Sequence, residues 1–156
     1  MTLPSSDPLY RPKCSRLAAT EPELSTQQTF QLPRTEAPLP PDLLPHLRVS
    51  FAETEEEMWR VRFGDAAAPI SPANEALVLS SLAAHLRQRL GRYRTSDEED
   101  EAVIADAACG PRRQVAARLL RIEKGILRAA LAQVLAMPGG AEADAAGAPQ
   151  TGVLLG

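Results

Sequence analysis

The sequence has few aromatic residues, few cysteines and no long run of apolar residues. Phe, Tyr and Trp make up 4% of the 156 residues, whereas alanine and leucine contribute 26 and 21. So few aromatic and β-branched residues disfavour a sandwich or barrel and favour helices. Cys14 and Cys109 are too few for a disulfide framework, and we expect free thiols rather than the one disulfide they could form. No stretch reaches the roughly 18 apolar residues that a membrane span needs.

An excess of charge of one sign is also lacking. The chain has 17 Lys and Arg against 20 Asp and Glu, a formal net charge of −3, which gives no overall electrostatic case for nucleic acid binding. The glycine-rich nucleotide-binding patterns and the G-x-S-x-G pattern do not occur, and His46 and His85 form no H-E-x-x-H-like pair. From the residues alone we therefore predict no catalytic, cofactor-binding or metal-binding residue.

The first residues do not have the pattern of a targeting signal. Residues 1–6 contain no basic segment followed by an apolar one, so we expect no secretory signal. Transit peptides are poor in acidic residues, whereas Asp7, Glu21 and Glu23 lie among the first basic residues. These features favour a mature or truncated start.

Alanine and leucine concentrate between residues 71 and 137 and predict three helices there. The apolar residues recur every three or four positions, as they do on one face of a helix. The expected helices cover about 72–93, 96–108 and 111–137. Because short connections favour antiparallel neighbours, we predict an all-α fold, a small helical bundle.

Capping residues mark the ends of these helices. Ser71 followed by Pro72 is typical of an N-cap and the first helical residue. Thr95, with Glu98 three residues later, fits a capping box, and further acidic residues there complement the helix dipole. Gly110 ends the second helix before Pro111 opens the third.

The third helix carries an apolar stripe and a basic one. Val115, Leu119, Ile122 and Ile126 begin the apolar stripe, which we expect to pack against other helices. The basic stripe is our candidate protein-binding site, and it consists of Arg118, Arg121, Lys124 and Arg128. It has two interpretations: a solvated face paired with the acidic run at 97–101, which we favour, or a surface for an acidic partner. The acidic run itself lacks the spacing of a calcium loop.

Residues 1 to about 70 contain many of the prolines and predict a partly irregular portion. Two short helices are expected within it. The first begins near Pro41, and the second follows Thr54, which can form a capping box with Glu57. We expect Trp59 and Phe63, four residues apart, to anchor the core rather than to form a ligand cage. The segment 138–156 has no periodicity, and we expect a disordered tail.

Several blocks of the sequence, taken in order, resemble a known module. They are DPLY (7–10), QTF (28–30) with LP (32–33), PPDLLPHLRV (40–49), YRTSDEEDEAVI (93–104) and PRRQVAARLLRIEKGILRAALAQV (111–134). They resemble the substrate-binding domain that follows the SET domain in Rubisco large-subunit lysine methyltransferases and in related protein-lysine and protein-histidine methyltransferases. The last two blocks are the most specific. The resemblance covers about residues 7–135, so we expect one such domain over 1–137.

The sequence departs from the family pattern at two positions of the third helix. Ile122 stands where the family often has glycine, and Gly125 stands where it has arginine or glutamine. A glycine inside a helix costs about 1 kcal/mol relative to alanine. These departures bear on helix stability and on any binding role of position 125 more than on membership.

The resemblance implies an accessory function. In the family, S-adenosylmethionine, the target lysine and the catalytic tyrosine belong to the preceding SET core, and this sequence contains neither that core nor its Asn-His motif. We therefore expect a non-catalytic substrate-recognition domain, present without its SET core, that binds no cofactor and does not transfer methyl groups alone. The implied partners are a protein substrate, the Rubisco large subunit or another methylated protein, and a SET core, but neither nucleic acid nor membrane.

Two alternatives to this function stay open. The chain is either a fragment of, or a partner to, an active S-adenosylmethionine-dependent protein methyltransferase, or it is a helical protein–protein adaptor. The resemblance also leaves the location open among chloroplast, cytoplasm and nucleus.

Overall fold

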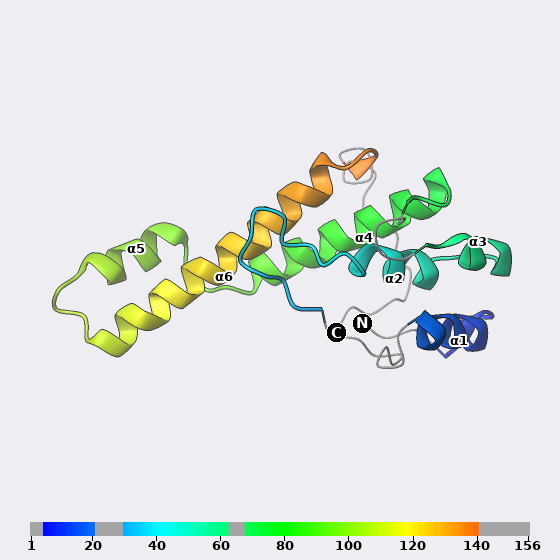
Figure 1. Ribbon diagram of the computed structural model, residues 1–156. Helices are drawn as coiled ribbons and strands as arrows, with labels where there is room; N and C mark the ends of the chain where they lie inside the picture. The colour runs from blue at the N-terminus through cyan, green and yellow to red at the C-terminus, as the bar shows by residue number, and fades with distance from the viewer. Residues whose placement is uncertain (1–4, 21–29, 63–67, 141–156) are drawn as a thin grey trace.

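The computed structural model describes residues 5–20, 30–62 and 68–140, and these residues form helices and connecting segments without a strand (Figure 1). The helices are α1 (Tyr10–Thr20), α2 (Leu43–Ser50), α3 (Glu55–Arg60), α4 (Pro72–Gly91), α5 (Asp97–Ala105) and α6 (Pro111–Ala136). The predicted all-α class is confirmed, and α4, α5 and α6 are the three helices expected between 71 and 137. The expected tail after residue 140 and Phe63 lie outside the described residues. No described helix is long and apolar enough to cross a membrane.

Helix α6 is the axis of the molecule. It has 26 residues, which span about 39 Å at a rise of about 1.5 Å per residue. Both α4 and α5 pack against α6, but they do not pack against each other. Figure 1 shows why: α4 lies along the C-terminal half of α6 and α5 along its N-terminal half. Residues 97–124, which we call the arm, therefore project away from the other helices.

The main hydrophobic core lies between α2, α4 and the C-terminal half of α6. Its buried members are Leu39, Leu43, Leu47, Phe51, Val78, Leu79, Leu82, Ala83, Leu86, Leu127, Ala130 and Val134. A second cluster joins α1, α2 and α3 through Leu17, Val49, Ala52, Met58 and Val61. Helix α2 lies between the two clusters, so most of its residues are buried. The arm contributes no buried residue to either cluster.

Two buried ion pairs involve the N-terminal helices, and one of them joins α2 to α4. Arg48 of α2 donates two hydrogen bonds to the Glu75 carboxylate of α4, at 2.7 and 2.8 Å. Lys13 of α1 donates to the Asp7 carboxylate at 2.6 Å and to the Ser50 carbonyl at 3.0 Å. These charges are paired, as burial requires. The Arg48–Glu75 pair and the bond from Lys13 to Ser50 link segments far apart in sequence.

Helix α1 lies in a segment for which no helix was predicted. We expected residues 1 to about 70 to be irregular apart from two short helices, and α1 is not one of those two. Pro12 is the third residue of the helix, and a proline in the first turn removes an N–H group that has no partner inside the helix. The buried Leu17 then holds α1 on the second cluster. Tertiary contacts thus stabilise a helix whose own pattern is weak.

Local hydrogen bonds move the ends of α5 from the expected positions. The N-cap is Ser96, not Thr95, and its side chain and that of Glu99 bond each other's backbone N–H groups in a capping box. The sequence TSDEE fits a capping box in either frame. The helix ends at Ala105 instead of 108 because the Asp106 carboxylate accepts a bond from the Ala108 N–H, which turns the chain.

Trp59 is not a core anchor, since 54% of it is exposed. Its ring instead lies 5.2 Å from the Arg16 guanidinium carbon, a cation–π contact at the surface. Both short N-terminal helices are confirmed as α2 and α3, and the Thr54 side chain caps α3 by accepting from the Glu57 N–H. Cys14 and Cys109 are free thiols.

Candidate functional site

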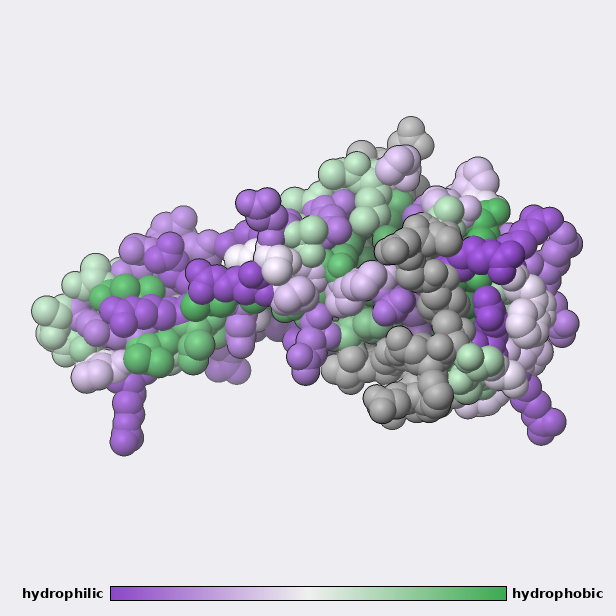
Figure 2. Space-filling view, viewed as in Figure 1, coloured by the Kyte–Doolittle hydropathy of each residue, from purple (hydrophilic) through white to green (hydrophobic). Residues whose placement is uncertain are grey.

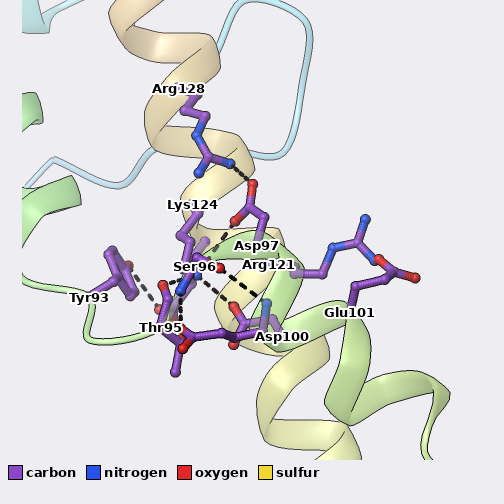
Figure 3. Close-up of polar contacts among 11 residues, drawn as sticks. Tyr93, Thr95, Ser96, Asp97, Asp100, Glu101, Arg121, Lys124 and Arg128 are labelled. Atoms are coloured by element: carbon purple, nitrogen blue, oxygen red, sulfur yellow. Dashed lines mark hydrogen bonds and ion pairs between the residues drawn. The ribbon is translucent and has the colours of Figure 1, made fainter.

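Three residues of the predicted basic stripe bond helix α5, and a buried ion pair among them holds α5 and α6 together (Figure 3). The Lys124 ammonium donates to the Asp100 carboxylate and to the Thr95 carbonyl, each at 2.6 Å. Lys124 and Asp100 are each only 2% exposed. The hydrogen bond from Lys124 lowers the pKa of Asp100, so this carboxylate is charged at neutral pH. Asp100 is the one buried residue of α5, so this pair is the centre of the arm.

Two exposed ion pairs flank the buried one. Arg121 pairs with Glu101, and Arg128 pairs with Asp97, as Figure 3 shows. The bond from Arg128 lowers the pKa of Asp97. Three of the four predicted basic residues, Arg121, Lys124 and Arg128, thus bond the acidic run of α5, as the pairing interpretation expects. These contacts are structural, and exposed pairs of this kind contribute little stability.

An open depression of about 460 Å³ lies on another side of α6. We call it the α6 groove, and it is lined by Arg34, Thr35, Ile104, Arg118, Arg121, Ile122, Gly125, Ile126 and Ala129. Three structural elements build it: α6 forms the floor, α5 supplies Ile104, and the connection before α2 supplies two residues. That connection is held on α6 by the Leu39 N–H, which donates to the Gln133 side chain at 3.1 Å.

The apolar stripe of α6 is only partly covered. We expected Val115 and Leu119 to pack against other helices, but they are 50% and 56% exposed. Leu127, Ala130 and Val134 are the apolar residues of this helix that enter the core. The prediction was wrong for the first half of the helix because α4 ends its contact there and α5 lies on a different face. Figure 2 shows apolar surface along the arm, among charged side chains.

Two arginines of the α6 groove lack an acidic partner among the described residues. Arg34 and Arg118 line the groove and are exposed, and neither makes an ion pair within the described ranges. Gly125 also lines the groove, and a Cβ atom there would meet nothing within 4 Å. The groove therefore combines apolar floor residues with unpaired positive charge.

Some residues of the groove lining had been singled out in the sequence. Arg118 and Arg121 were predicted as binding residues, and Gly125 was noted as a departure from the family. Arg34, Thr35 and Ile104 were missed, because they come from other segments and only the tertiary structure brings them to α6. Lys124 belongs to the buried network and does not line the groove.

The described residues do not gather the groups that metal chemistry would use. No cluster of three or more His, Cys, Asp or Glu side chains in the described ranges is placed to hold a metal ion. His46 is 1% exposed and stands edge-on to the Phe30 ring at 5.4 Å. Burial lowers its pKa to about 4, so it is a neutral core residue at physiological pH.

Comparisons with known proteins identify the family to which the chain belongs. Residues 4–127 match the family model described as Rubisco LSMT substrate-binding. The chain is 34% identical to the actin-histidine N-methyltransferases of Homo sapiens and Mus musculus, and 33% identical to that of Xenopus tropicalis. Each similarity covers 81% of this chain but only 23% of the relative, so the chain spans about a quarter of these enzymes.

The matched residues include the second hydrophobic cluster, the main cluster except Ala130 and Val134, the whole of α5 and the first two thirds of α6. The match therefore extends over the fold rather than over one motif, and it agrees with the blocks singled out in the sequence. The chain belongs to the Rubisco LSMT substrate-binding family, a family of substrate-binding domains of protein methyltransferases.

Proposed function

We propose that this chain recognises a protein substrate on behalf of a SET-type protein methyltransferase and does not itself transfer the methyl group. The observation that supports the proposal is the family match over residues 4–127, which covers most of the described fold. The relatives are named for methylation of a histidine in actin, a protein substrate. The α6 groove supplies an exposed surface on which a protein segment can lie.

The α6 groove does not suit S-adenosylmethionine. That cofactor carries a sulfonium and an ammonium group against one carboxylate, so its net charge is positive. The groove is lined by three arginines and no carboxylate. We therefore assign the cofactor and the chemistry to a SET core, and to this chain the binding and positioning of the substrate.

Substrate recognition is tested by direct binding. The purified chain, immobilised for biolayer interferometry, is exposed to monomeric actin and to the Rubisco holoenzyme, with serum albumin as the control. We expect saturable binding to actin or to Rubisco and none to albumin. If the chain binds neither actin nor Rubisco, the result would count against substrate recognition as its role.

The absence of methyl transfer is tested separately. The purified chain is incubated with tritiated S-adenosylmethionine and with actin or Rubisco, and the protein-bound label is counted. We expect no label above background in either mixture. Label on actin or Rubisco that increases with the amount of chain would show that the chain is itself an enzyme.

A further inference from the structure

The α6 groove is a surface where the described residues leave apolar side chains exposed and arginines without an acidic partner. The core face of α6 is covered by α4, and the face with Lys124 is covered by α5. The remaining face carries Val115 and Leu119, half exposed, and continues into the groove through Ile122. An exposed apolar patch of this kind, bordered by polar residues, commonly marks a binding surface.

The dimensions of this face suit a short peptide segment. From Val115 to Ala129 the helix rises about 21 Å, at about 1.5 Å per residue. An extended segment of about six residues or a helix of about four turns covers that length. Gly125 keeps the middle of the floor low, because no side chain stands there and nothing lies within 4 Å of its Cβ position. The floor is therefore open to close approach by another chain.

The charges of the groove identify the chemistry of its occupant. The acids of α5 that face α6 are paired with Arg121, Lys124 and Arg128. Arg34 and Arg118 both line the groove and have no such partner among the described residues. Arginine binds carboxylates through two parallel hydrogen bonds. A ligand that satisfies this surface carries apolar side chains for the floor and carboxylates for the rim.

We propose that the α6 groove binds an acidic amphipathic segment of the protein substrate, in which apolar side chains alternate with Asp or Glu. The apolar side chains lie over Ile104, Ile122 and Ile126, and the carboxylates pair with Arg34 and Arg118. The inference rests on the proposed function for the identity of the partner. The chemistry of the segment follows from the groove itself.

The proposal is tested with a random library of peptides about 16 residues long, displayed on phage and selected against the immobilised chain. We expect the enriched peptides to combine Leu, Ile or Phe with Asp or Glu. One enriched peptide is then synthesised with a fluorescent label, and its Kd is measured by fluorescence anisotropy. Because part of the attraction is electrostatic, affinity should fall as salt is raised.

Matched variants locate the binding site. Gly125→Gln places a side chain on the floor and should weaken binding by about tenfold or more, as loss of a central contact does. Gly91→Gln, in α4, is the control, because it is also a helical glycine with nothing within 4 Å of its Cβ position. Arg118→Glu should weaken binding of the same peptide by about fivefold, whereas Arg112→Glu, outside the groove, should change it less than about twofold. Circular dichroism verifies that every variant is folded.

Several results would overturn the proposal. They are failure to enrich any peptide, enrichment of basic peptides, and binding that Gly125→Gln leaves unchanged. A chain that dimerises in solution and becomes monomeric on Gly125→Gln would assign the groove to a second copy. If only the proposed function fails, peptides still bind at the groove, but neither actin nor Rubisco binds the chain. If actin or Rubisco binds equally well to Gly125→Gln, the proposed function stands and the groove is not its site.

Discussion

The buried pair between Lys124 and Asp100 should hold the arm together. Replacing Lys124 with Met removes the ammonium group but keeps a side chain of similar length. Asp100, which is 2% exposed, then loses its cation, and the Thr95 carbonyl loses its donor. Breaking a buried ion pair from one side costs about 3–5 kcal/mol, because a charge stays buried without a partner. We expect Lys124→Met to lose about that much free energy of unfolding.

Urea denaturation followed by circular dichroism at 222 nm measures the loss. With a slope of about 2 kcal/mol per molar urea, a loss of about 3 kcal/mol moves the midpoint down by about 1.5 M. Arg121→Met is the matched control, since it removes a cation from the exposed pair with Glu101. That control should cost less than about 1 kcal/mol.

A double variant and a pH series test whether the unpaired charge of Asp100 causes the loss of stability. Lys124→Met combined with Asp100→Leu should recover most of the stability, because an apolar pair of similar volume commonly replaces a buried ion pair without loss. In the native chain the lowered pKa of Asp100 stabilises the fold above its unfolded pKa, about 3.9, and this contribution disappears as pH falls through the folded pKa. In Lys124→Met, burial without the cation raises that pKa, so the penalty should shrink as pH falls.

Two results would refute this role of the buried pair. One is a loss of free energy of unfolding in Lys124→Met no larger than in Arg121→Met, and the other is a double variant no more stable than Lys124→Met. Either result would mean that solvent screens the pair. Docking of α5 on α6 would then depend on other contacts, such as those of its partly buried apolar residues.

Three further predictions concern other parts of the fold. His46 has a folded pKa of about 4 against 6.5 when unfolded, so the native chain should lose up to about 3 kcal/mol of stability as pH falls from 6.5 to 4. His46→Leu should flatten that part of a plot of urea midpoint against pH, and an unchanged slope would contradict the assignment. Gly125→Ala should raise the free energy of unfolding by about 0.5–1 kcal/mol, because the Cβ position is open and alanine is the better helix former; a loss of stability in urea would show that the glycine is required by the backbone. Ser96→Ala should cost about 1 kcal/mol as an N-cap, and an unchanged urea midpoint would show that Ser96 does not cap the helix.

Helix α6 presents a different kind of surface on each of three sides. Leu127, Ala130 and Val134 join the apolar core, and Lys124 joins the buried ion pair. The third side, with Ile122 at its centre, is left to the groove. One long helix thus connects the core to the arm and displays the surface we propose for binding. A substitution on the groove side can therefore alter binding without removing a core contact.

The sequence by itself determined the helical class, the order of the long helices and the family. Helix propensity and capping act within a few residues of one another, so Ser71 and Pro72 mark the start of α4 without reference to the fold. The pairing of the basic stripe with the acidic run also followed from spacing, because residues three or four apart share a helix face. The family followed from blocks of sequence that keep their order.

Only the tertiary structure decided what covers each face. A periodic pattern shows that Val115 and Leu119 share a side of α6, but their exposure depends on where α4 and α5 come to lie. Helix α1 has a weak pattern of its own and is stabilised by the burial of Leu17. Arg34 reaches the groove from a segment about 90 residues away because its connection is fixed on α6. Contacts between distant segments depend on packing that no local pattern contains, so the groove was visible only in the folded chain.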